Sequence, residues 1–158
     1  MVECRDPSQE FKTAMRKYAY SVSIVSNTSN KGINNAITIS SFTSISVDPP
    51  SVLMCINKSS SIHKTLIIDS PFCINLLNEK QKEIAELCAN PNKSDERFNN
   101  NKWTNSNPPK LLKALVHLIC RVDRIIDYET HSIVIGIVNE STTSNHHNTL
   151  MYKNQRFL

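Results

Sequence analysis

Apolar and polar side chains alternate over much of this chain, which is the pattern of β-strands with one buried and one exposed face. The alternation is clear over residues 20–26 and again over residues 131–138. Residues 51–56 and 71–77 are almost continuously apolar, which is typical of buried strands. These four stretches are therefore expected to form the framework of a sheet.

Three more stretches are strand-like, at residues 36–46, 111–122 and 150–158. Polar segments separate the strands, and Gly32 marks the tip of an expected hairpin. The total is about six or seven strands. Together with a few short helices, this predicts an antiparallel β-barrel decorated with helices, in a mainly β or α+β class.

A first helix is expected to begin at the N-terminal end of the chain. Asp6 can cap it, and Pro7 suits its first position. Apolar residues then recur at helical spacing on one face, which we expect to lie in the core. They are Phe11, Ala14, Met15 and Tyr18.

A second helix is expected after the strand at residues 71–77. Asn78 and Gln81 have the spacing of a capping box. Its inner face would carry Ile84, Leu87 and Cys88. The segment that follows, residues 90–109, is polar.

The segment from Asn34 to His63 carries an unusual density of hydroxyl groups. Its strand alternation breaks around Ser41–Phe42, which predicts a bulge or bend. Pro49 and Pro50 then end the strand, because neither can donate to a sheet ladder. The hydroxyl side chains are Thr38, Ser40, Ser41, Thr43, Ser44, Ser46, Ser59, Ser60 and Ser61. We interpret this segment as the cradle of a cofactor.

The second group of hydroxyls, at residues 59–61, follows Lys58 and precedes a short helix expected to end near Asp69. A serine at a helix start satisfies free backbone N–H groups, and the same helix start favours a phosphate. Capping would explain one serine, whereas three beside a lysine favour phosphate binding.

Composition narrows the choice of function. The chain has 158 residues, enough for one domain over residues 1–158, and a net charge of +4. Its basic residues are scattered, which argues against a nucleic-acid partner. With only two glycines, the usual glycine-rich phosphate loops cannot form, so hydroxyl groups and non-glycine backbone would have to hold a phosphate.

The five cysteines show no CxxC pair. We expect buried free thiols and no metal site. The chain also shows no signal peptide and no apolar run long enough for a membrane span. We therefore expect a cytoplasmic protein that binds no membrane.

The ordered motifs of the chain resemble those of the flavin reductase-like family. The longest are 11–19 (FKTAMRKYA), 38–50 (TISSFTSISVDPP) and 57–63 (NKSSSIH). Shorter matches follow in the expected order over nearly the whole length: Phe72–Leu77, Gln81, Leu87, Arg97-Phe98, Trp103, Cys120–Val122 and Leu150–Tyr152.

The resemblance implies an FMN-binding split barrel, antiparallel and homodimeric, that transfers hydride from NADH or NADPH to FMN or FAD. It also implies that reduced flavin passes to the oxygenase component of a two-component monooxygenase. Thr38, Ser40 and Ser41 would line the flavin ring and ribityl chain, and Ser44, Cys55, Ile56 and Asn57 would add further wall. Lys58, Ser60 and Ser61 would hold the phosphate.

His131 matches the histidine of the family's Gly-Asp-His motif, which implies a catalytic role at the nicotinamide or flavin. Here the motif reads Glu129-Thr130-His131. A structural strand histidine is the alternative reading of His131. At the level of the whole chain, two alternatives stay open: a flavin-binding electron-transfer protein without reductase activity, and a small β-barrel that binds nucleic acid or protein.

Overall fold

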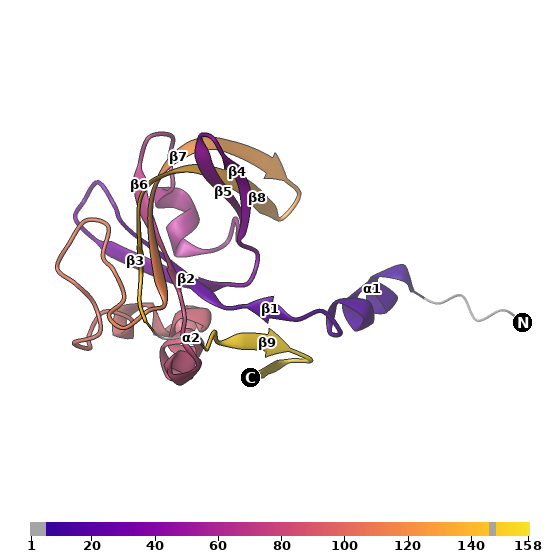
Figure 1. Cartoon of the computed structure of the whole chain (residues 1–158). Helices are drawn as coiled ribbons and strands as arrows, with labels where there is room; N and C mark the ends of the chain where they lie inside the picture. Colours follow the sequence, from indigo (N-terminus) through magenta and orange to yellow (C-terminus); the bar gives the residue numbers. More distant parts are fainter. Residues whose placement is uncertain (1–5, 146–147) are drawn as a thin grey trace, which may run out of the picture.

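The computed structural model describes residues 6–145 and 148–158 (Figure 1). Its helices are α1 (Pro7–Met15) and α2 (Lys82–Ala89), with short 3₁₀ turns η1 (Ser61–Thr65), η2 (Glu79–Gln81) and η3 (Pro91–Glu96). Its strands are β1 (Tyr20–Ser21), β2 (Ser23–Thr28), β3 (Asn34–Ile39), β4 (Thr43–Val47), β5 (Pro50–Asn57), β6 (Pro71–Leu76), β7 (Val116–Tyr128), β8 (His131–Thr143), β9 (Met151–Lys153) and β10 (Arg156–Phe157).

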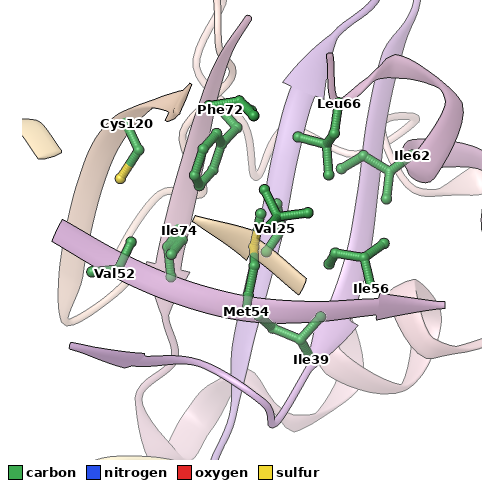
Figure 2. Packing of buried hydrophobic residues seen from close by; sticks show 12 residues of the cluster. Val25, Ile39, Val52, Met54, Ile56, Ile62, Leu66, Phe72, Ile74 and Cys120 are labelled. Atoms are coloured by element: carbon green, nitrogen blue, oxygen red, sulfur yellow. The ribbon is translucent and has the colours of Figure 1, made fainter. Parts of the chain in front are cut away.

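Seven strands form one curved antiparallel sheet in the order β3-β2-β6-β7-β8-β5-β4. Its centre is the long hairpin of β7 and β8, which carries two register shifts. Such bulges add bend and twist to a hairpin. Figure 2 shows the strand that carries Val52 and Met54, which is β5, passing in front of the strand that carries Val25, which is β2. A small sheet, β1-β9-β10, lies beside it. The expected mainly β, antiparallel split-barrel class is confirmed.

The interior of the curved sheet is filled by branched and aromatic side chains from several strands (Figure 2). Phe72 and Ile74 of β6 lie opposite Val52 and Met54 of β5, and Ile62 of η1 closes one end of the core. All five side chains are buried. The apolar runs at residues 51–56 and 71–77 thus form the core strands that the sequence predicts.

A second core lies between α2 and strands β2 and β3. The capping box of Asn78 and Gln81 is present, and Ile84 and Cys88 are buried on the inner face of α2. These features confirm the sequence prediction for this helix.

The prediction that the apolar face of the first helix lies in the core is wrong for the single chain. Asp6 does cap α1, accepting from Ser8 N at 3.0 Å. However, α1 buries none of its residues, and Phe11 and Tyr18 are 65% and 61% exposed. Figure 1 shows that α1 extends away from the sheet. Its C-cap residue Arg16 meets the C-terminal hairpin, where Arg16 O accepts from Asn154 N at 2.9 Å.

The C-terminal stretch was expected to form one strand, but it forms the β9–β10 hairpin. Asn154 and Gln155 both have positive φ, which reverses the chain between Lys153 and Arg156. The strand expected at residues 20–26 is likewise divided at Val22, because β1 pairs with β9 while β2 pairs with β3 and β6. The helix expected to reach Asp69 is the shorter turn η1.

Among the described helices, none combines the length and apolar character needed to cross a membrane.

Candidate functional site

The bend predicted at Ser41–Phe42 is the first part of the site. It lies between the end of β3 and the start of β4. The Ser41 hydroxyl donates to the Cys55 carbonyl at 2.9 Å and accepts from the Cys55 N–H at 3.1 Å. Ser41 therefore fastens the bend to β5 and keeps the hydroxyl-rich segment beside that strand.

Thr38 and Ser40 line a groove of about 390 Å³ beside the bend. Tyr152 and Phe157, in edge-to-face contact at 5.1 Å between ring centroids, form part of its wall. The Thr38 hydroxyl donates to Ala85 O of α2 at 2.7 Å, so its hydrogen is engaged within the protein. Ser40 is exposed at the groove.

The remaining residues of the predicted wall differ in how accessible their side chains are to a ligand. Ser44 is exposed on β4, and Cys55 is half-buried on β5. Ile56 is buried in the core and can reach a ligand only through its backbone.

The turn that begins at Asn57 is the second part of the site. The Asn57 side-chain oxygen accepts from Ser59 N at 2.9 Å and from Ser59 Oγ at 2.8 Å. The Ser60 hydroxyl donates to Asn57 O at 2.7 Å and makes no capping bond to η1. With only five residues in η1, helix-end electrostatics contribute little, and Lys58 and the hydroxyl groups are the main polar features of the turn.

The two parts of the site adjoin each other along β5. Cys55, which holds the bend, and Asn57, which begins the turn, are two residues apart on the same face of this strand. Two residues of strand span roughly 6–7 Å. The fold therefore brings Ser40, Ser41, Cys55 and Asn57 into one continuous polar strip.

His131 lies beside this turn. It pairs with Asn57 across β5 and β8, and Lys58 N donates to Thr130 O at 3.0 Å. The His131 ring is exposed, and its Nδ1 is 2.9 Å from Thr130 Oγ1. The structure thus brings together the two sequence motifs that contain Asn57 and His131.

Sequence reasoning missed three residues at the same place: Asp127 of β7, Ser132 of β8 and His63 of η1. Ser132, completely buried, donates to Asp127 Oδ1 at 2.7 Å, and His63 Nε2 lies 2.9 Å from Ser132 Oγ. Lys58 Nζ is 3.6 Å from the same Asp127 oxygen. The hydrogen bond from Ser132, followed by the charge of Lys58, lowers the pKa of Asp127 below its ordinary value. The pairing of Asp127 with Ser132 across the hairpin is a tertiary feature that no local motif signals.

Glu129, at the tip of the β7–β8 hairpin, has a φ of 45°. Left-handed backbone is unfavourable for a residue with a Cβ and favourable for glycine. We therefore expect Glu129→Gly to raise the free energy of unfolding by up to about 1 kcal/mol, measured by urea denaturation. Glu129→Gln, which removes the charge and keeps the Cβ, is the matched control. Equal stability changes in the two variants would contradict the backbone explanation.

A larger cavity, of about 780 Å³, lies beside η2 and the start of α2. None of the predicted site residues lines it. Several of its polar groups are already paired, including Glu83 with Lys102 and Glu79 with Asn148. The smaller groove beside Thr38 and Ser40 is the one that adjoins the polar strip.

Within the described residues, no group of three or more His, Cys, Asp or Glu side chains is arranged to hold a metal ion.

The sequence of this chain matches a known protein family and several characterised relatives. The model of the flavin reductase like domain matches residues 15–158. The reductase component of the FADH₂-dependent resorcinol hydroxylase of Rhizobium sp. strain MTP-10005 is 27% identical over 152 residues, which cover 94% of this chain and 85% of that protein. The NADH:riboflavin 5′-phosphate oxidoreductase of Streptomyces pristinaespiralis is 31% identical over 138 residues, covering 85% and 77% of the two chains.

A solved structure agrees with both matches. The NADH:FAD oxidoreductase of Streptomyces globisporus C-1027, in complex with NAD and FAD fragments, superposes with a TM-score of 0.87 at 25% identity, covering 99% of this chain and 96% of that one. The family model spans all the described strands, and the chain therefore belongs to the flavin reductase-like domain family.

Proposed function

We propose that this protein is an NAD(P)H-dependent flavin reductase, which transfers hydride from NADH or NADPH to FMN or FAD and supplies reduced flavin to a partner monooxygenase. The observation that carries the proposal is the continuous polar strip from Ser40 to Asn57, in a chain of this family. The names of the two relatives, a hydroxylase reductase component and an NADH:riboflavin 5′-phosphate oxidoreductase, support the same reaction.

The residues of the strip suit the parts of a flavin. The groove beside Thr38 and Ser40, walled by Tyr152 and Phe157, offers aromatic and polar surface to the ring. Ser41 and Ser44, with the backbone of Cys55 and Ile56, would accompany the ribityl chain. The turn of Asn57, Lys58, Ser60 and Ser61 would hold the phosphate. The Lys58 ammonium and the Ser61 hydroxyl can make charge-assisted hydrogen bonds to it, and the Ser60 hydroxyl can do so after it turns away from Asn57 O.

The chemistry of hydride acceptance belongs to the flavin ring when it is bound. The residues of this chain would bind the flavin and the nicotinamide donor and orient them toward each other. The hydrogen bonds of Ser41 fix the bend, so the polar groups of the strip are held before the ligand arrives. His131, exposed beside Asn57, would position the nicotinamide donor, whose hydride must come within about 3–3.5 Å of the acceptor atom.

The surface of the single chain supports a homodimer. Val47 on the edge strand β4 is 90% exposed, and Tyr128 at the end of β7 is 71% exposed. Together with Phe11 and Tyr18 of the extended helix α1, these side chains form apolar surface that a second copy of the chain would bury. We also propose that residues 1–158 form one domain, which acts in the cytoplasm. The free thiols of Cys55, Cys73, Cys88 and Cys120 suit that reducing setting.

The test is steady-state oxidation of NADH and of NADPH by the purified protein, with FMN and with FAD. Turnover with at least one pair is expected. A protein that binds flavin but oxidises neither donor would contradict the reductase function and select an electron-transfer protein. A protein that shows no flavin binding would contradict the cradle itself.

A further inference from the structure

Asp127 occupies an unexpected position for a carboxylate. Its Oδ1 is 3.6 Å from Lys58 Nζ, and Lys58 is the cation of the proposed phosphate turn. A phosphate that binds Lys58 directly must come within about 3 Å of the ammonium. It would therefore lie near a second group of its own charge.

The carboxylate is held in this position by a chain of hydrogen bonds. The single hydroxyl proton of Ser132 is donated to Asp127 at 2.7 Å. Ser132 Oγ must then accept from His63 Nε2, 2.9 Å away, so this ring nitrogen carries a hydrogen. Ser132 is completely buried and pairs with Asp127 across the hairpin. Its hydrogen bond therefore fixes the orientation of the Asp127 carboxylate.

The turn is fixed to the same hairpin. Lys58 N donates to Thr130 O, three residues from Asp127 along the chain. These bonds fix the Lys58 backbone and the Asp127 carboxylate relative to each other, so the carboxylate stays within reach of the ammonium at the end of the Lys58 stem. The lowered pKa of Asp127, caused first by the Ser132 hydrogen bond, is consistent with a carboxylate that stays ionised.

We propose that Asp127 is a specificity-determining residue that competes with the flavin phosphate for Lys58 and so limits the preference for phosphorylated over unphosphorylated flavin. The inference rests on the proposed function, because it assigns a role at the same phosphate turn. A weakened grip on the phosphate suits a reductase whose reduced flavin must leave for another protein.

The experiment compares FMN with riboflavin, which share the ring and ribityl chain and differ in the phosphate. Dissociation constants are measured by flavin fluorescence quenching for the unsubstituted protein and for Asp127→Asn. Asparagine keeps an oxygen that can accept from Ser132 and removes the charge. At low salt, FMN binding should tighten by roughly three- to tenfold, the scale of repulsion between exposed charges about 4–6 Å apart. Riboflavin binding should change by less than about twofold.

Asp123→Asn is the matched control. Asp123 lies on the same strand and pairs with Arg124, so its replacement changes the net charge equally at a distance from Lys58. Equal effects of Asp127→Asn on the two flavins, no effect on either, or the same FMN effect from Asp123→Asn would overturn the inference. A protein that binds neither flavin would instead overturn the proposed function, and this inference with it.

Salt gives a second measurement on the same variants. The difference in FMN affinity between the unsubstituted protein and Asp127→Asn should shrink as ionic strength rises, because exposed charges are screened. A difference that stays constant with salt would overturn the electrostatic explanation.

Discussion

Lys58→Met is expected to weaken FMN binding by roughly thirtyfold, or about 2 kcal/mol, the scale of a lost charge-assisted hydrogen bond. Methionine keeps much of the apolar stem and removes the ammonium, the one cationic group of the turn at residues 57–61. It also leaves Asp127 without its 3.6 Å partner, so the remaining charge at the site is repulsive to phosphate. Isothermal titration calorimetry with FMN measures the change in the dissociation constant.

Two controls make the result specific. Lys64→Met removes an exposed lysine of η1 and should leave FMN affinity unchanged. Riboflavin should bind the unsubstituted protein and the Lys58→Met variant with equal affinity. Loss of riboflavin binding in parallel with FMN would mean that Lys58 supports the turn rather than the phosphate.

Gly136→Ala is expected to lower the free energy of unfolding by about 1–3 kcal/mol, the usual cost of overpacking a core. Gly136 lies on β8, paired with Val52 and with Val122. A Cβ at this position would lie 2.5 Å from Phe72 Cζ and 2.9 Å from Phe72 Cε1. Phe72 is completely buried, so its ring can move only by disturbing its neighbours. Urea denaturation measures the change.

A double-mutant cycle with Phe72→Leu separates the steric clash with the Phe72 ring from any other destabilising effect of Gly136→Ala on the strand. Leucine lacks the ring atoms that the alanine methyl would meet, so Gly136→Ala should cost less in that background. Asn139→Ala, at an exposed position of the same strand, should change stability little. An equal cost of Gly136→Ala in both backgrounds would contradict the role of Phe72.

Much of the fold follows from local patterns in the sequence. The break in alternation at Ser41–Phe42 is the bend between β3 and β4, and the spacing of Asn78 and Gln81 is a capping box. Local patterns succeed here because periodicity and capping depend on residues close in the chain.

Other features depended on partners that local patterns cannot identify. The apolar face of α1 is visible in the sequence, but the sequence does not show whether the rest of the chain covers it, and in the single chain Phe11 and Tyr18 are exposed. The division of the first strand at Val22 follows from a sheet change, since β1 pairs with β9 near the other end of the sequence.

In the candidate site, too, some features are visible in the local sequence and others arise from tertiary contacts. The hydroxyl-rich residues and Lys58 stand out in the sequence because their density is local. The engagement of Thr38 with α2 and the contacts among Asp127, Ser132 and His63 arise only when β7, β8 and η1 meet. The sequence therefore predicted the residues of the strip better than the hydrogen bonds that hold them.

The most direct test of flavin reduction by this chain is an anaerobic titration of the flavin-loaded protein with NADH, and then with NADPH, followed by visible absorbance. The absorbance band of oxidised flavin should be lost with at least one donor, at about one donor per flavin, because a hydride carries the two electrons that full reduction requires. Retention of the oxidised band with both donors would contradict the claim that this chain reduces flavin.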